Sequence, residues 1–278
     1  GHGYKCSQVD PPIDDRAASS LSWSSRTITF SLSQDGTSQI DNEYEALAQC
    51  LDVWEFAQGC APPNAQTDID LELADEPSPN ATIGYNFWPG ATNENLIIFR
   101  DDAWPHPGSG PFQFGLTTVT SMALTGEILD ADIEFNTAGV TFSLAPEPSE
   151  ADLISIAVHE LGHTLGLDHS AISQSTMSAQ YTPGSTEPRT LHCDDHNAIA
   201  FKYPQGEPNG YCERDAGDCS RCFSPLTSDS TLILEATDPQ PDAGCSCRAQ
   251  PFSSTWIFLA LLCLLRTPKA LLRQRLYR

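Results

Sequence analysis

Hydrophobic and polar positions alternate with two different periods along the first two hundred residues. A period of two, which is typical of half-buried strands, runs over residues 26–32 and again over residues 68–74. Further strands are predicted at 95–100, 116–120 and 131–135. Residues 42–58 instead place apolar side chains at helical spacing, namely Leu47, Leu51, Trp54 and Phe56. The pattern predicts a strand, a long helix and then several strands.

A second helix is predicted to begin after residue 149. Ser149 is a suitable N-cap, and Glu150 and Asp152 suit the positive end of a helix dipole. The apolar stripe of this helix comprises Leu153, Ile156, Ala157 and Leu161. Gly166 allows the chain to leave the helix through a left-handed conformation. We therefore expect the helix to end shortly before this glycine.

This second helix carries the string H-E-x-x-H-x-x-G-x-x-H, which begins at His159. His159 and His163 are four residues apart, so they lie on one helix face and can share one metal ion. The turn at Gly166 can carry His169 to a third ligand position. Three neutral imidazoles leave one coordination position open, as in catalytic zinc sites. The sequence predicts one catalytic Zn²⁺.

Glu160 projects beside the predicted ligands without joining them. Water bound in such a site has a pKa of roughly 7, so it can be deprotonated near neutral pH. Glu160 is then the predicted general base, which takes the proton from water and passes it to the leaving amine. A solvent-exposed helix with incidental histidines is the alternative that this spacing disfavours.

These residues resemble the metzincin metallopeptidases. Ser170, directly after the third histidine, is similar to the matrixin (matrix-metalloprotease-like) branch. Met177 lies eight residues after His169 and resembles the matrixin Met-turn, which places a methionine beneath the metal. Without this spacing, ordinary core packing would be the better interpretation. Tyr181 is similar to the matrixin tyrosine in the wall of the pocket for the residue after the cut.

The resemblance covers residues 20–204 and implies an α+β fold. It implies a metzincin-type catalytic domain with a twisted mixed five-stranded sheet, a long helix, a zinc-binding active-site helix, a Met-turn and a C-terminal helix. In the family, the sheet edge above the zinc pairs with an extended substrate. Our candidates for that edge strand are Gly115, Leu116, Thr117, Thr118 and Val119.

Residues 191–204 resemble the final matrixin helix, which opens with paired aspartates. The resemblance implies that one of Asp194 and Asp195 supports the Met-turn, while simple capping of the helix is the alternative. A second group of acids, Asp130, Asp132 and Glu134, alternates along a predicted strand. This row allows a calcium ion, because hard cations prefer carboxylates, but the solvated face of a strand is the better interpretation.

The charge of the chain excludes one class of partner. The 278 residues include 37 acidic and 14 basic ones, for a net charge of −23. A protein this acidic repels nucleic acid, so we expect no nucleic-acid partner. All 37 acids lie in residues 1–250, whereas the last 28 residues hold five basic groups and no acid.

Ten cysteines indicate an oxidising compartment and several disulfides. Cys50 and Cys60 bracket the end of the long helix and are one candidate pair; Cys6 with Cys193 is a weaker candidate. Spacing alone leaves the connectivity open.

The flanking regions divide into three parts. Residues 1–19 are an N-terminal extension, residues 205–250 a linker rich in Cys, Pro and Gly, and residues 251–278 a short hydrophobic segment with a basic tail. The apolar run at 256–265 is shorter than the roughly 20 residues that span a bilayer. The tail resembles the C-terminal sorting tag of myxobacterial surface proteins, which implies lipidation or processing at Cys245 or Cys247. A buried or interfacial helix is the competing interpretation.

We therefore predict a secreted or cell-surface zinc endopeptidase that acts on protein or peptide substrates. We expect it to be monomeric and to bind no nucleic acid. The tail resemblance predicts anchoring in a Gram-negative outer envelope. The alternative is a zinc-bound adhesion module without turnover, against which the intact Glu160 argues, because such a module needs no base. A zinc hydrolase acting on a non-peptide amide is a third hypothesis.

Overall fold

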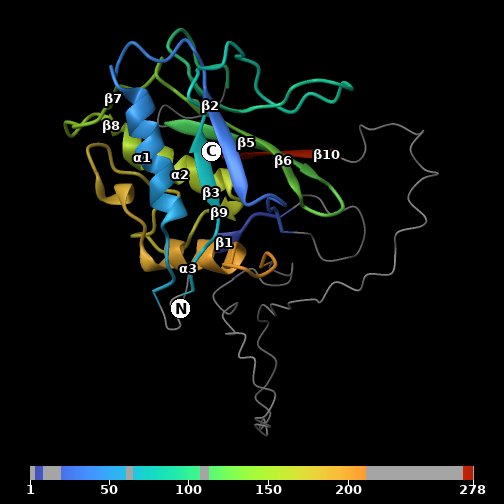
Figure 1. Ribbon diagram of the computed structural model, residues 1–278. Helices are drawn as coiled ribbons and strands as arrows, with labels where there is room; N and C mark the ends of the chain where they lie inside the picture. The colour runs from blue at the N-terminus through green and yellow to red at the C-terminus, as the bar shows by residue number, and fades with distance from the viewer. Residues whose placement is uncertain (1–3, 9–19, 61–64, 107–112, 211–271, 278) are drawn as a thin grey trace, which may run out of the picture.

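The computed structural model describes residues 4–8, 20–60, 65–106, 113–210 and 272–277 (Figure 1). The sorting-tag cysteines Cys245 and Cys247 and the apolar run at 256–265 lie outside these residues. Their predicted roles therefore stay predictions. No helix within the described residues is long and apolar enough to cross a membrane.

A mixed sheet of six strands forms the centre of the molecule, in the order β10-β5-β6-β4-β2-β3. The strands are β2 (Thr27–Leu32), β3 (Asp70–Leu73), β4 (Asn95–Phe99), β5 (Gly115–Met122), β6 (Ile128–Phe135) and β10 (Leu272–Tyr277). Strands β2, β3, β4 and β6 pair in parallel, whereas β5 is antiparallel to both β6 and β10. Five of the six strands are those predicted, and the α+β mixed-sheet fold is confirmed. The sixth strand, β10, was not predicted.

Two helices pack on the sheet, the amphipathic α1 (Glu43–Glu55) and the largely buried α2 (Leu153–Thr164). Helix α1 packs against α2 and β3, and α2 packs against β5 and β6. Trp54 in α1 is fully buried, and its indole N–H donates to the Val158 carbonyl of α2 over 2.8 Å. Phe56 is 71% exposed because α1 ends at Glu55, so its predicted place in the apolar stripe is wrong.

The remaining elements are short. Two-residue strands pair as β1 (Lys5–Cys6) with β9 (Leu167–Asp168) and as β7 (Phe142–Ser143) with β8 (Ala151–Asp152). A 3₁₀ turn covers Glu187–Arg189, and the predicted last helix is α3 (Cys193–Lys202). Tyr203, just after α3, is fully buried and donates its hydroxyl hydrogen bond to the Leu165 carbonyl at the end of α2. Helix α3 is thereby fixed beneath the active-site helix.

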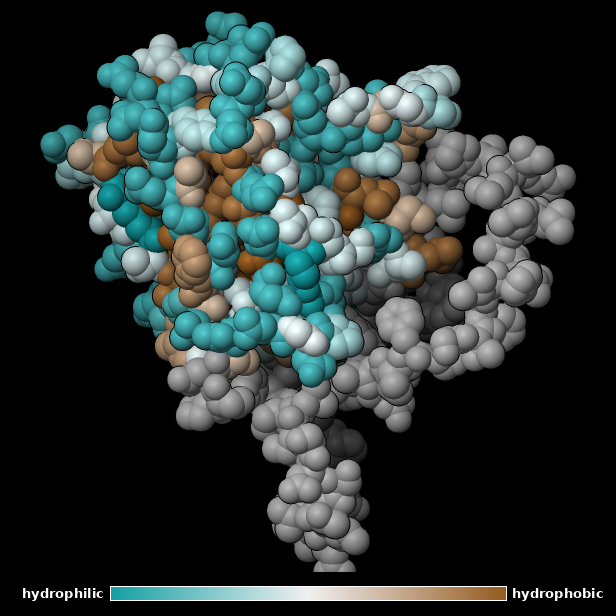
Figure 2. Space-filling view, viewed as in Figure 1, coloured by the Kyte–Doolittle hydropathy of each residue, from teal (hydrophilic) through white to brown (hydrophobic). Residues whose placement is uncertain are grey.

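The surface facing the viewer in Figure 2 is mainly hydrophilic, interrupted by smaller hydrophobic patches. This agrees with the strongly acidic composition of the chain. The predicted solvated row of acids, however, is not part of the surface. Asp130, Asp132 and Glu134 are each no more than 2% exposed. The interpretation of these residues as a solvated strand face is therefore wrong.

Two of the buried acids, Asp132 and Glu134, have specific partners. Asp132 accepts hydrogen bonds from the backbone N–H groups of Leu96 and Gly84, at 2.8 and 2.6 Å. Glu134 accepts from Arg100 at 2.7 Å and contacts His106 at 2.9 Å. Buried carboxylates are stabilised by such pairing. The alternating pattern suggested one solvated face, but both faces of β6 are covered in the structure. The sequence pattern therefore does not reveal that these acids are buried and paired.

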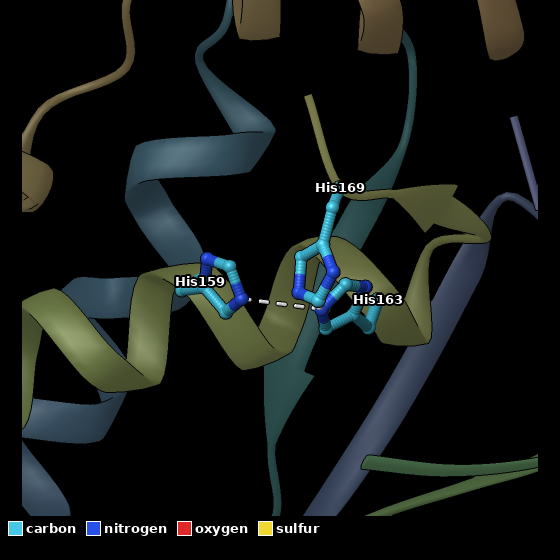
Figure 3. Close-up of side chains that lie close together, drawn as sticks. All are labelled: His159, His163 and His169. Carbon is cyan, nitrogen blue, oxygen red and sulfur yellow. Dashed lines mark hydrogen bonds between the residues drawn. The ribbon is translucent and has the colours of Figure 1, made fainter. Parts of the chain in front are cut away.

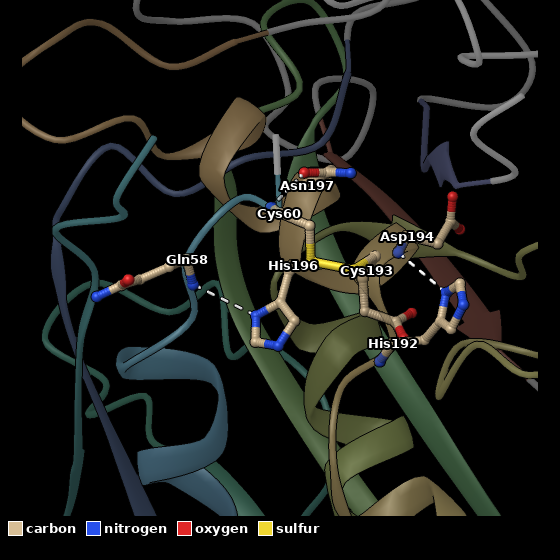
Figure 4. The surroundings of a disulfide bond; sticks show 8 residues. Gln58, Cys60, His192, Cys193, Asp194, His196 and Asn197 are labelled. Carbon is tan, nitrogen blue, oxygen red and sulfur yellow. Dashed lines mark hydrogen bonds between the residues drawn. A yellow bond between two sulfur atoms is a disulfide. The ribbon is translucent and has the colours of Figure 1, made fainter. Parts of the chain in front are cut away.

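The disulfide within the described residues joins Cys60 to Cys193 (Figure 4). Both predicted pairs are wrong, since each shares one cysteine with this bond. Cys50 instead lies in the middle of α1 as a buried thiol, with its sulfur 3.1 Å from the Ala46 carbonyl oxygen. The bond ties the segment after α1 to the first residue of α3, which are 133 residues apart in sequence.

Candidate metal centre and active site

Helix α2 begins three residues later than predicted. Ala151 and Asp152 belong to β8, so Asp152 rather than Ser149 is the N-cap, and its carboxylate accepts from the Ser155 N–H over 2.9 Å. Asp152 is fully buried and would carry an uncompensated charge without Arg189, whose Nε donates to the same carboxylate over 2.8 Å. A cap and a buried ion pair therefore fix the start of the helix that carries the predicted ligands.

The chain turns sharply between the second and third histidines. Gly166 has a φ of +79°, and a Cβ there would lie 2.3 Å from the Leu21 carbonyl oxygen. Glycine is therefore required at 166 for two reasons: the backbone is left-handed, and the Leu21 carbonyl leaves no space for a side chain. The turn leads through β9 to His169, which brings that residue back over α2.

The three predicted histidines converge on one point (Figure 3). The Nε2 atom of His163 lies 3.2 Å from that of His159 and 3.3 Å from that of His169. The Nδ1 atoms of His159 and His163 lie 2.6 and 2.9 Å from the backbone carbonyls of Thr176 and Leu167. Because a carbonyl only accepts, each Nδ1 carries the proton and each Nε2 presents a lone pair.

This donor set fits zinc. Tetrahedral zinc with nitrogen ligands at about 2.0–2.1 Å separates those nitrogens by about 3.3 Å, which is the distance from His163 Nε2 to each of the other two Nε2 atoms. Burial lowers the pKa of His159 to about 4 and that of His163 well below its ordinary value, and it lowers the pKa of His169. All three imidazoles are therefore neutral, as metal ligands must be.

Glu160 lies beside this centre and is only 5% exposed. Its Oε2 accepts a hydrogen bond from the Thr117 hydroxyl at 2.5 Å. A Cβ on Gly115 would lie 2.6 Å from its Oε1, so glycine at 115 leaves space for the carboxylate. Burial raises the pKa of Glu160 to about 8, while the Thr117 hydrogen bond lowers it; a cation held by the adjacent histidines opposes the rise.

Met177 packs directly beneath the helix. It is 1% exposed, and a Cβ on Gly162 would lie 2.2 Å from its sulfur. Asp195 holds the turn, since its carboxylate accepts from the backbone N–H groups of Thr176 and Met177 at 2.8 and 3.2 Å. It also accepts from the Ser175 hydroxyl.

The two interpretations of the paired aspartates therefore both apply to Asp195. Besides the Met-turn, it accepts from the N–H of His192, the N-cap of α3, at 3.0 Å. Asp194 has another partner, because it accepts from the hydroxyl of Ser170, directly after the third histidine, at 2.7 Å. Both carboxylates connect the start of α3 to the segment that follows the metal centre.

Tyr181 lies at the far end of the turn region. Its hydroxyl accepts from the Asp152 N–H and donates to the Ser185 carbonyl, each at 2.9 Å. Its ring meets that of Phe114 edge to face, with centroids 5.2 Å apart. The half-buried Tyr181 is thus held in place between α2 and the loop after the Met-turn.

The candidate substrate edge, Gly115 to Val119, forms the first part of β5, next to Glu160. In this structure β10 pairs with β5 from Thr117 to Met122, and the role of the candidate edge in substrate binding stays a prediction. Sequence reasoning did not assign Thr117 its contact with Glu160 or predict that Arg275 and Tyr277 lie at this edge. No short-range pattern signals either, because both depend on distant segments meeting.

A mixed sheet, an active-site helix and three converging imidazoles above a buried methionine together define a metzincin-type zinc centre. Comparison with known proteins places the chain within this class: the matrixin model of peptidase family M10 matches residues 22–204. The chain belongs to the matrixin family, whose members are zinc-dependent metalloendopeptidases.

Individual relatives are distant or match over short stretches. Stromelysin-3 of Xenopus laevis is 47% identical over 57 residues, which are 20% of this chain and 12% of the relative. Matrix metalloproteinase-C of Caenorhabditis elegans is 25% identical over 224 residues, or 77% of this chain and 34% of the relative. Metalloendoproteinase 2-MMP of Arabidopsis thaliana is 39% identical over 75 residues, covering 27% and 20% respectively. The matched parts span about a third or less of these relatives.

Proposed function

We propose that this protein is a secreted or cell-surface endopeptidase that hydrolyses peptide bonds in proteins, with zinc held by His159, His163 and His169. The observation that carries the proposal is the position of Glu160, a buried carboxylate beside the three ligands and held by Thr117. A binding module would use the histidines but has no need of a base there. The non-catalytic adhesion module is therefore the weaker candidate.

The proposed chemistry divides between the metal and the chain. Zinc in such a centre supplies a Lewis acid that polarises the scissile carbonyl and acidifies water. Glu160 accepts the proton of the attacking water and delivers it to the leaving amine. The neutral His159 and His163 keep their Nε2 atoms directed at one point because backbone carbonyls hold their Nδ1 protons.

Other residues bind the substrate. The backbone of β5 offers pairing groups to an extended peptide, which fixes the peptide beside Glu160. Tyr181 and Phe114 form part of the wall of the pocket for the residue after the cut. Met177 supports the centre from below and takes no part in the reaction.

We also propose that the protein is exported and attached to the cell surface. The Cys60–Cys193 disulfide is expected in an oxidising compartment. Anchoring through the tail, with lipidation or processing at Cys245 or Cys247, rests on the resemblance of the tail to a sorting tag. We further propose that the protein acts as a monomer.

The test is Glu160→Gln in the full chain loaded with zinc. We expect casein or gelatin cleavage to fall by about 10²-fold or more, with one equivalent of zinc retained by elemental analysis. Glu45→Gln, which changes an exposed carboxylate on α1, is the matched control and should cleave as the parent does. Unchanged cleavage in Glu160→Gln would rule out its role as the base.

The adhesion module makes a different prediction. It requires that the zinc-loaded parent cleave no member of a broad peptide library, analysed by mass spectrometry. The same library measures the preference of the pocket bounded by Tyr181.

A further inference from the structure

The C-terminal strand β10 lies on the sheet edge that the proposed substrate needs. Its six residues pair antiparallel with β5, from Leu272 opposite Met122 to Tyr277 opposite Thr117. Figure 1 shows β10 beside β5, although the two are far apart in sequence. An edge strand has one free row of N–H and C=O groups, so only one chain can pair with it at a time.

The end of β10 lies close to the reacting groups. Thr117, opposite Tyr277, is the residue whose hydroxyl holds Glu160. The Tyr277 ring stacks on the imidazole of His163, with centroids 4.2 Å apart and planes 14° from parallel. Tyr277 is only 4% exposed, so this aromatic ring is packed into the protein beside a zinc ligand.

A second side chain fixes β10 along the same edge. Arg275 Nη2 lies 2.7 Å from Oδ2 of Asp168, the residue before the third zinc ligand. Arg275 Nη1 donates to the backbone carbonyl of Gln8 at 2.8 Å. Strand β10 is therefore held by backbone pairing with β5 and by the contacts of Arg275 with Asp168 and Gln8.

Strand β1 contributes to this arrangement. Lys5 and Cys6 pair with Asp168 and Leu167 of β9, so an N-terminal segment braces the residues that Arg275 contacts. Leu276, which alternates with Arg275 and Tyr277 along β10, is 45% exposed. The buried Tyr277 and the paired Arg275 thus face the protein, while the intervening side chain faces outward.

We propose, on the basis of the peptidase function above, that Leu272–Tyr277 is an autoinhibitory strand which competes with peptide substrates for β5. Arg275 on Asp168 and Tyr277 on His163 are its two anchors. Substrate binds only the fraction of molecules in which the strand has left the edge, so the apparent KM is the intrinsic KM divided by that fraction. The turnover of bound substrate is unaffected.

The kinetic test uses Arg275→Glu and Tyr277→Ala in the zinc-loaded full chain. Each change weakens one anchor, and we expect KM for a peptide substrate to fall by about two- to tenfold with kcat unchanged. Leu276→Ala is the matched control, because it alters an exposed side chain of the same strand. A KM that stays at the parental value in both anchor variants would overturn the proposal.

A second measurement does not require hydrolysis. Hydrogen exchange of the backbone amides in Thr117–Met122 should be faster in Tyr277→Ala than in the parent or in Leu276→Ala, because the edge opens. Equal protection in all three proteins would also overturn the proposal. A third outcome separates the two proposals. If exchange in Thr117–Met122 changes as expected but neither the parent nor the anchor variants cleave any peptide, β10 covers the edge and the peptidase function is contradicted.

A peptide added in trans provides the third arm. The hexapeptide of residues 272–277, Leu-Arg-Gln-Arg-Leu-Tyr, should inhibit Tyr277→Ala competitively. It should inhibit the parent at least several-fold more weakly, because the tethered strand already fills the edge at high effective concentration. Failure of the peptide to inhibit either protein at millimolar concentration would argue against β5 as the shared site.

Discussion

At the scale of single residues, two glycines beside the metal centre are required by packing rather than by backbone conformation. Gly162 lies between the two helical ligands, and any side chain there would meet Met177 and Trp54. Gly115 leaves room in the same way for the carboxylate of Glu160. Each glycine therefore marks a place where a neighbouring side chain approaches the backbone too closely for a Cβ.

Gly162→Ala tests this packing. Alanine favours an isolated helix by up to about 1 kcal/mol over glycine, so helix propensity alone predicts stabilisation. We expect destabilisation by about 1–2 kcal/mol, because a Cβ would lie 2.2 Å from Met177 Sδ and 2.8 Å from a Trp54 ring carbon. Thermal unfolding measures the sign, and adding Met177→Ala should reduce the penalty. A higher Tm for Gly162→Ala would contradict this account.

The buried carboxyl group of Asp130 should make the free energy of unfolding depend on pH. Burial, reinforced by the charge of Asp132, raises the pKa of Asp130 to about 8. The folded state therefore binds a proton that the unfolded state releases near pH 4, and stability falls as pH rises through roughly 4 to 8. Asp130→Asn removes this cost, so we expect it to raise the unfolding free energy at pH 8 by on the order of 1 kcal/mol, with little gain at pH 4. Urea unfolding at the two pH values measures the difference, and an equal gain at both would contradict the titration.

At the scale of elements, α3 acts as a support for the metal centre. Its first turn carries Asp195, which holds the Met-turn, and its first residue is cross-linked to the segment after α1. The helix therefore connects the base of the active site to the long helix on the sheet. The sequence predicted the helix and its aspartates, but it did not predict the cross-link that fixes them.

Removal of the cross-link tests this connection. Cys60→Ser with Cys193→Ser should lower the unfolding free energy by about 2–5 kcal/mol, since it frees a long loop in the unfolded chain. We also expect weaker zinc binding in a chelator competition, because the first turn of α3 becomes less constrained. Cys50→Ser leaves the bond intact and should retain the parental zinc affinity. If the double variant also retained that affinity, the disulfide would have no part in supporting the centre.

At the scale of the whole molecule, charge and edge coverage are the dominant features. A net charge of −23 makes the folded state repel itself, because folding brings the acids closer together. The basic strand β10 partly offsets this charge where Arg275 meets Asp168. The acidic chain thus places one of its few arginines beside the proposed active site.

Salt should therefore stabilise this protein. We expect Tm to rise by on the order of 3 °C between about 0.02 M and 0.5 M NaCl, because the screening length shortens and self-repulsion declines. NaCl and KCl at equal ionic strength should give the same shift, which separates screening from ion-specific effects. A Tm that is independent of ionic strength would contradict a significant contribution from net charge.

The sequence alone determined the elements whose signal is local. The period of the hydrophobic pattern predicted α1 and five strands of the sheet, and the spacing of His159, His163 and His169 about one glycine turn predicted their convergence. Such features depend on residues within about ten positions of one another, where helix pitch and backbone conformation fix the geometry.

Tertiary structure alone decided the features that join distant segments. The burial of Asp130, the pairing of Cys60 with Cys193 and the docking of Tyr277 on His163 each depend on which surfaces meet after the chain folds. The residues next to a carboxylate, a thiol or a phenol in sequence do not indicate which distant group it will contact. These contacts are set by packing across the sheet, and they decide which strand covers the edge of β5.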